Sequence, residues 1–256
     1  MSAYDDYLDN LLERMQRLRA DEAESLESAA EICTSAIGGG GLVHLFGTGH
    51  GSMPAMEAFP RTGSYVGWHP IVIEALGPHL RVGGEGSVHQ FRYLQGAEGY
   101  GKAILDSYPI HEGDAFVISS HSGVNRVVME VALAVKEAGH PLVAITSREH
   151  SSQATPRHNS GKRLSEVADV VLDNHAPFGD AVLALEGLEQ RVAAVSTSLS
   201  MALVGALVAS TAEHLLEQGV EPLVLGHIDL AGNRIPDEMR RDYVQAFQNR
   251  LWRRDT

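Results

Sequence analysis

The chain has 256 residues, enough to bury the core of one large α/β domain. Its net charge of −13 and its scattered Lys and Arg residues argue against a nucleic-acid-binding surface. The acidic N-terminus lacks a secretory-signal pattern, no uninterrupted apolar stretch reaches the roughly 18 residues of a membrane span, and the single Cys33 cannot form an internal disulfide. We therefore expect a cytoplasmic protein without a membrane or nucleic-acid partner, in which local N–H groups and hydroxyls hold any anionic metabolite.

Apolar spacing predicts helices that alternate with strands. Residues 3–37 carry apolar side chains at helical three-to-four spacing, and the four glycines at 38–41 end this segment. The predicted elements then follow as strand 42–46, helix 53–59, strand 70–75, helix 98–108, strand 114–119, helix 126–138, strand 141–147, strand 170–172 and a buried helix at 192–212. Because such alternation builds a parallel sheet covered on both faces, we predict an N-terminal helical arm at 1–37 and one α/β domain at 38–256.

Small polar residues follow the strands at 42–46 and 114–119, where each strand meets a helix. Open α/β sheets bind ligands at this edge, and the first turn of a helix presents free N–H groups to an anion. A further pair of hydroxyls ends the strand at 141–147. The candidate phosphate ligands are Gly49, His50, Ser52, Ser119, Ser120, His121, Ser122, Asn125, Thr146 and Ser147.

Serines at the start of helices are also common N-caps, so a purely structural role is the alternative for each of them. The recurrence of Gly beside Ser at two junctions favours a binding site instead. A dinucleotide site is not indicated, because the G-x-G-x-x-G pattern that would begin at Gly47 requires a glycine where the chain has Ser52.

The two junctions resemble the signature loops of sugar-isomerase (SIS) domains. FGTGHGS at 46–52 is similar to the first loop, and SHSGVN at 120–125 is similar to the second, in which Asn125 replaces the usual Thr and removes a hydroxyl. The similarity runs from about residue 40 to 215, and in detail the chain resembles the bacterial SIS proteins grouped as UPF0309. This resemblance implies a three-layer αβα sandwich of flavodoxin-like topology that binds a sugar phosphate without a cofactor. It also implies a homodimer or homotetramer in which a neighbouring subunit completes each site.

Two further stretches are similar to one SIS branch, the N-acetylmuramic acid 6-phosphate etherases. Residues 56–63 resemble their Ser-Glu-Cys-Pro-Pro-Thr segment, and residues 95–98 resemble their Glu-Gly-Ala-Glu segment. In that branch one Glu removes the C2 proton and the other protonates the group that leaves C3. The resemblance therefore implies that Glu98 is the base and Glu57 the acid. The alternative is that Glu57 is a solvated helix residue and Glu98 a carboxylate favoured by the helix dipole.

Histidines supply further candidates. The rings of His50 and His121 lie in the signature loops, within reach of a phosphate or a sugar hydroxyl. His214 occupies the region where several SIS isomerases place a ring-opening histidine, although a buried structural role fits it equally well. No metal is expected, because the one cluster at 173–175 has no partner ligands at zinc spacing.

These residues predict a lyase or dehydratase that performs C2 deprotonation and C3 β-elimination. The predicted substrate is an N-acetylhexosamine 6-phosphate, such as N-acetylglucosamine 6-phosphate, which would lose water, or N-acetylmuramic acid 6-phosphate, which would lose lactate. An aldose–ketose isomerase that returns the C2 proton to C1 is the second candidate. A sugar-phosphate sensor without catalytic activity is the third.

Overall fold

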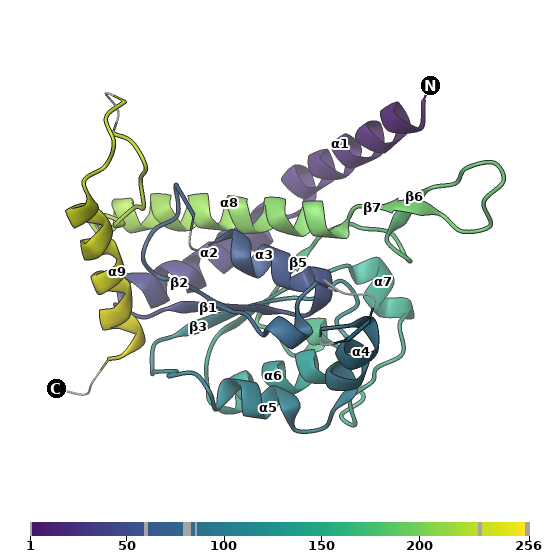
Figure 1. The fold of residues 1–256 in the computed structure, drawn as a ribbon, viewed down its shortest axis with the longest axis horizontal. Coiled ribbons are helices and arrows are strands. Elements are labelled where there is room, and N and C mark those ends of the chain that lie inside the picture. Colours follow the sequence, from purple (N-terminus) through teal and green to yellow (C-terminus); the bar gives the residue numbers. More distant parts are fainter. Residues whose placement is uncertain (1, 59–60, 79–82, 85, 230–231, 254–256) are drawn as a thin grey trace.

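The computed structural model describes residues 2–58, 61–78, 83–84, 86–229 and 232–253. Its centre is a five-stranded parallel sheet in the order β2-β1-β3-β4-β5 (Figure 1). The strands are β1 Val43–Gly47, β2 Trp68–Ile71, β3 Ala115–Ser119, β4 Leu142–Thr146 and β5 Val170–Asp173. This order is the flavodoxin-like one, so the predicted fold class is confirmed.

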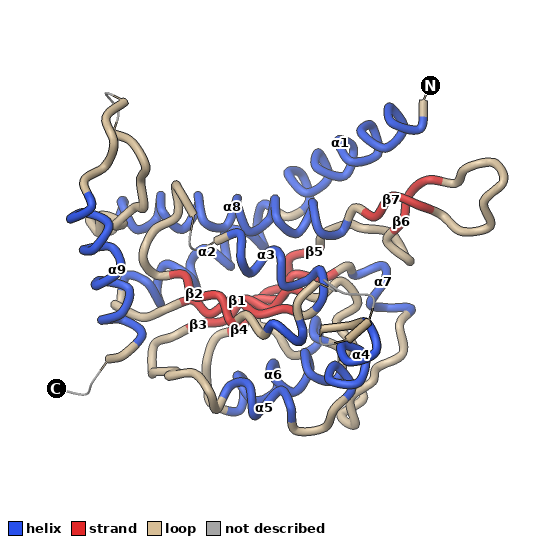
Figure 2. Tube along the Cα trace, viewed as in Figure 1, coloured by secondary structure: helices blue, strands red, loops and turns tan. Residues whose placement is uncertain are grey.

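Helices cover both faces of the sheet (Figure 2). The helices are α1 Ala3–Asp21, α2 Ala23–Gly38, α3 Ser52–Glu57, α4 Val88–Gly96, α5 Tyr100–Leu105, α6 Arg126–Glu137, α7 Arg148–Gln153, α8 Ser196–Glu217 and α9 Asp237–Leu251. Helices α2, α3 and α8 lie on one face, and α4, α5 and α6 lie on the other. The remaining strands, β6 Ala181–Leu183 and β7 Val192–Ala194, form an antiparallel hairpin that projects beside α1.

The central strands are buried on both faces, which explains their unbroken apolar sequence. Successive side chains of a strand point to opposite sides. In β3, Val117 therefore joins the core under α2 and α8, while Phe116 and Ile118 join the core under α5 and α6. Because α2 supplies Ala29, Ala30 and Cys33 to the first of these cores, it packs as part of the layered body.

Several predicted elements are corrected by the structure. The helix predicted at 3–37 breaks at Glu22, whose buried carboxylate accepts a hydrogen bond from the Asp173 backbone N–H at 3.0 Å and contacts the His175 ring. The helix predicted at 98–108 begins only at Tyr100. Gly99, the residue before it, has a left-handed φ of 77° and therefore cannot be part of the helix. The strand predicted near 70–75 is β2, which lies earlier at Trp68–Ile71, and α4, α7, α9 and the hairpin were not predicted.

The buried helix predicted at 192–212 is α8, which starts later because residues 192–194 form β7. Among the described residues, α8 alone is long and apolar enough to cross a membrane, and 39% of its most apolar window is buried. The expectation concerned uninterrupted apolar stretches, whereas α8 reaches this limit by its mean hydropathy, with serines and threonines along it. Leu199, Leu203 and Leu207 nevertheless pack into the core with α2 and the sheet, which places α8 as a core helix.

A buried polar cluster joins the sheet to α9 at the end opposite the signature loops. The Asp114 carboxylate accepts hydrogen bonds from the Leu42 backbone N–H at 2.8 Å and from Arg253 at 2.9 Å, and it lies 3.0 Å from His44 Nε2. His44 Nδ1 lies 2.8 Å from His69 Nδ1. Since His44 Nε2–H donates to Asp114, its Nδ1 accepts from His69, which defines one tautomer for each ring. Burial would raise the pKa of Asp114, but the hydrogen bonds from His44, Leu42 and His111 hold it below its ordinary value.

This cluster predicts a loss of stability in mild acid. Burial, together with the nearby His44, lowers the pKa of His69 to about 4, whereas the unfolded chain titrates near its ordinary value of about 6.5. Between these pH values the unfolded state binds a proton that the folded state does not, so stability is complete above pH 6.5 and falls as the pH approaches 4. We expect His69 to account for about 1–3 kcal/mol of this loss in urea unfolding measured from pH 7 to pH 4.

The His69→Gln variant should show a shallower pH slope of the free energy of unfolding than the wild type. His158→Gln, which changes a loop histidine outside the cluster, should keep the wild-type slope. Identical slopes for His69→Gln and the wild type would contradict the prediction.

Candidate functional site

The two signature loops meet because β1 and β3 are neighbours in the sheet. Gly47 at the end of β1 pairs with Ser119 at the end of β3, so both loops leave the sheet side by side. A Cβ on Gly51 would lie 2.7 Å from the Ser119 carbonyl oxygen, and a Cβ on Gly47 would overlap the Gly51 backbone. Only glycine permits this approach of two backbones, which accounts for the glycines of the first loop.

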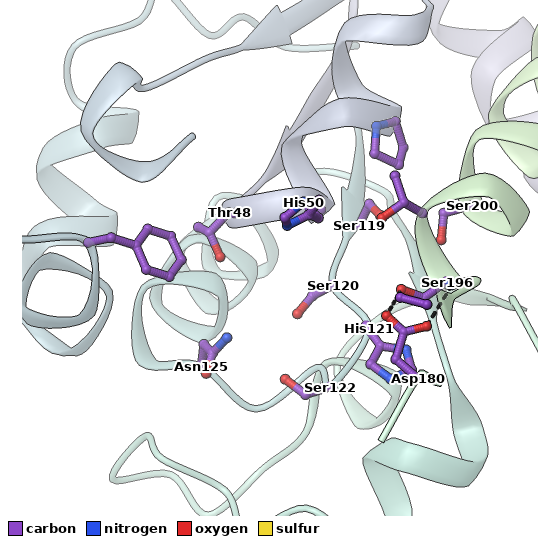
Figure 3. Close-up of a pocket in the computed structure, with 16 residues that line it drawn as sticks. Thr48, His50, Ser119, Ser120, His121, Ser122, Asn125, Asp180, Ser196 and Ser200 are labelled. Atoms are coloured by element: carbon purple, nitrogen blue, oxygen red, sulfur yellow. Dashed lines mark hydrogen bonds between the residues drawn. The ribbon is translucent and has the colours of Figure 1, made fainter. Parts of the chain in front are cut away.

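A cavity of about 310 Å³ lies between these loops and the start of α8 (Figure 3). Seven of the predicted phosphate ligands line it, namely Gly49, His50, Ser119, Ser120, His121, Ser122 and Asn125. Asn125 is the N-cap residue of α6, but its side chain does not cap the helix and instead accepts a hydrogen bond from Arg157 at 3.0 Å. The first turn of α6 therefore keeps N–H groups that no side chain caps.

Three predicted phosphate ligands do not line the cavity. The Ser52 hydroxyl is buried and donates to the Gly49 carbonyl at 2.7 Å. Thr146 donates to the His121 carbonyl at 3.1 Å, and Ser147 donates to the Ala176 carbonyl at 2.6 Å while capping α7. These hydroxyls hold the loops in place behind the cavity wall.

The three predicted catalytic side chains also lie outside the cavity lining. Glu57, at the end of α3, pairs with Arg61, and the segment that resembles the etherases continues through residues 59–60, which lie outside the described residues. Glu98 is 79% exposed and lies 3.7 Å from Arg126. His214 lies 2.8 Å from Glu27, and the rise of α8 places it roughly 27 Å beyond the cavity end of this helix.

The sequence did not single out the third wall of the cavity. Asp180, Ser196, Thr197 and Ser200 form this wall, and Thr48 of the first loop lies across the cavity from it (Figure 3). The Asp180 carboxylate accepts hydrogen bonds from the backbone N–H groups of Val195 and Ser196 at 3.0 and 2.7 Å, and from the Ser196 hydroxyl at 2.6 Å. The Ser-Thr-Ser run before an apolar helix is a helix-start signal, whereas no local pattern pointed to Asp180.

His121 has an unusual environment inside the cavity wall. Neither of its buried ring nitrogens has a hydrogen-bond partner among the residues that the structure describes. Burial lowers the pKa of His121 to about 4, against the opposing effect of the Asp180 charge, and the His150 ring lies 4.3 Å away between centroids. His121 is therefore neutral at pH 7, with a ring that is able to donate one hydrogen bond and accept another. Within the described part of the chain, no group of three His, Cys, Asp or Glu residues is arranged to hold a metal ion.

The family model described as "SIS domain" matches residues 6–147, more than half of the chain. The chain belongs to the SIS domain family. A UPF0309 protein of Geobacillus thermodenitrificans is 36% identical to this SIS protein over 248 residues, covering 96% of each chain. A UPF0309 protein of Streptomyces coelicolor is 33% identical over 226 residues, covering 87% of this chain and 88% of the relative. The resemblance to the UPF0309 group is therefore confirmed.

Solved structures of two isomerases share the fold of this SIS protein. A phosphoheptose isomerase from Neisseria gonorrhoeae matches with a TM-score of 0.52 at 15% identity, over 82% of this chain and 97% of that one. A phosphoheptose isomerase from Francisella tularensis matches with a TM-score of 0.50 at 13% identity, over 83% of this chain and 100% of that one. At these identities the match establishes the fold alone.

The contacts of Asp180 predict a stability effect. Asp180→Ala removes the carboxylate that accepts three hydrogen bonds from the start of α8, so we expect a loss of about 1–3 kcal/mol in urea unfolding. Asp180→Asn keeps an acceptor oxygen and should lose less. Unfolding of the alanine variant at the wild-type urea concentration would show that Asp180 does not hold the start of α8.

Proposed function

We propose that this SIS protein binds a sugar phosphate with the phosphate at Ser120, Ser122 and the first turn of α6. One observation carries this proposal: hydroxyls line the cavity together with Asn125, the N-cap residue of α6, whose side chain leaves the first turn of this helix uncapped. No Lys or Arg is among the residues described as lining the cavity. Uncharged donors of this kind bind a phosphate dianion locally, which suits a protein whose overall charge is negative.

We further propose that the enzyme eliminates the C3 substituent of an N-acetylhexosamine 6-phosphate in its open-chain form. Glu98 removes the C2 proton, the C–H electrons form the C2–C3 double bond, and the C3–O bond breaks. N-acetylglucosamine 6-phosphate would release water, and N-acetylmuramic acid 6-phosphate would release lactate. The segment of Glu98 borders the cavity, because Gln95 donates a hydrogen bond to Thr48 at 2.9 Å. A sugar that extends from the phosphate site past Thr48 would approach this segment.

Glu57 and His214 require a second subunit in this proposal. Both lie away from the cavity of their own chain, so we assign them to the site of a neighbouring copy in a homodimer or homotetramer. There Glu57 protonates the leaving oxygen, and His214 opens the sugar ring. A monomeric mass by light scattering at assay concentrations would exclude this assignment.

Binding is tested with Ser122→Ala. Loss of one hydroxyl donor to a charged phosphate should weaken binding of N-acetylglucosamine 6-phosphate about threefold to tenfold in calorimetry. Ser107→Ala, which changes an exposed serine on the far side of α5, is the matched control and should bind as the wild type does. Equal affinity of all three proteins would place the phosphate elsewhere.

Catalysis is tested with Glu98→Gln. The wild type should convert N-acetylglucosamine 6-phosphate to a product lighter by one water in mass spectrometry, and the variant should bind the sugar but lose at least about a hundredfold in rate. Wild-type turnover by the variant would contradict the assignment of the base. Conversion of the aldose to a ketose of equal mass would favour the isomerase, and binding without conversion would favour the sensor.

A further inference from the structure

A second hollow, of about 750 Å³, opens beside the cavity. It shares Phe91 and Asn125 with the cavity, so the two volumes meet at these side chains. It lies between α4 and the start of α6, and its polar lining comes from Arg92, Gln95, Asn125, Arg126 and Arg157. A ligand held in the cavity has access to this hollow past Asn125.

Three arginines gather here although the whole chain carries a net charge of −13. Arg157 donates to the side-chain oxygen of Asn125 at 3.0 Å, and Arg126 donates to that of Asn159 at 3.2 Å. Both acceptors are neutral, so these hydrogen bonds orient the guanidinium groups without offsetting their charge.

Only one carboxylate offsets the charge of this hollow. Among the described residues, Glu98 alone lies within ion-pair distance of the three arginines, at 3.7 Å from Arg126. Arg92 forms no hydrogen bond or ion pair with a residue that the structure describes. The hollow therefore concentrates positive charge at a concave surface, which attracts anions.

The chemistry of the two volumes differs. The cavity presents hydroxyls, backbone N–H groups and the Asp180 carboxylate, whereas the hollow presents guanidinium groups, whose planar fork binds carboxylates and phosphates through paired hydrogen bonds. One phosphate at Ser120 and Ser122 leaves Arg92 and Arg157 without an anionic partner among the described residues.

We infer that this hollow binds a second anionic group, a carboxylate or a phosphate, on the same sugar phosphate. The inference rests on the proposed function, because the first phosphate sets the position from which the sugar reaches the arginines. Within the proposed substrates it favours sugar phosphates that carry an additional anionic substituent, and it makes Arg92 and Arg157 specificity-determining residues.

Two matched pairs of ligands test the inference by calorimetry. Glucitol 6-phosphate and gluconate 6-phosphate differ by a carboxylate at C1. The reduced sugar alcohols of N-acetylglucosamine 6-phosphate and N-acetylmuramic acid 6-phosphate differ by a lactyl carboxylate at C3. None of the four has an aldehyde, so the proposed elimination cannot consume them during the measurement.

In at least one pair, the ligand with the second anion should bind the wild type about tenfold more tightly than its partner. Arg92→Gln should reduce this ratio severalfold while leaving the affinity for the simpler ligand nearly unchanged. Arg157→Gln should also reduce the ratio, and because it frees the Asn125 side chain it should weaken binding of the simpler ligand as well. Arg19→Gln, which removes the same charge from the exposed face of α1, should keep the wild-type ratio.

Equal affinities within both pairs would overturn the second subsite and leave the proposed function standing. An equal loss for both members of a pair in the arginine variants would assign the arginines to the first phosphate, which also overturns the inference. Failure of the wild type to bind any of the four ligands would contradict the proposed function, and the inference with it.

Discussion

The cavity depends on direct contact between the backbones of the two signature loops. The ends of β1 and β3 are hydrogen-bonded neighbours, and the loops that follow them pack together where Gly47, Gly51 and Ser119 meet. A larger residue at either glycine would overlap backbone atoms that have no freedom to move without parting the strands. Because the loops touch here, hydroxyls and N–H groups from segments 70 residues apart face one volume. The chemical character of the cavity follows from this contact.

Two helices begin at the cavity, and their first turns differ. The Asp180 carboxylate accepts hydrogen bonds from the backbone N–H groups of Val195 and Ser196 and from the Ser196 hydroxyl, so the positive end of α8 already has a negative partner. The start of α6 has no such partner, because the side chain of Asn125 turns to Arg157. The start of α6 therefore has N–H groups free to bind an anion, whereas a carboxylate already occupies the start of α8. In the proposed function this asymmetry would orient a sugar phosphate, with its phosphate toward α6 and its hydroxyls toward Asp180.

Burial lowers the pKa of two histidines, His69 and His121, which lie in separate places. At the base of the sheet, His44 and His69 form a relay of hydrogen bonds to Asp114 that joins α9 to the core. In the cavity wall, His121 is buried beside His150 without a hydrogen-bond partner among the described residues. In the first arrangement the hydrogen bonds between His69, His44 and Asp114 all form within the chain, which indicates a structural role. The second leaves hydrogen-bonding capacity for a molecule in the cavity.

The sequence by itself determined the layered α/β class with a parallel sheet and seven of the cavity residues, because strand period, glycines and helix-start serines act over a few neighbouring residues. The flavodoxin-like strand order came from the resemblance to SIS domains. Tertiary packing determined the positions of the remaining site residues. The hydroxyls of Ser52, Thr146 and Ser147 donate hydrogen bonds to backbone carbonyls of the loops and do not face the cavity. The long predicted N-terminal helix breaks at Glu22, whose carboxylate accepts a hydrogen bond from β5. Asp180 accepts a hydrogen bond from Val195, 15 residues later in the chain, at the start of α8. The orientation of their helices and turns determines where Glu57, Glu98 and His214 lie. Such contacts join segments distant along the chain, where no residue spacing records which side chains will meet.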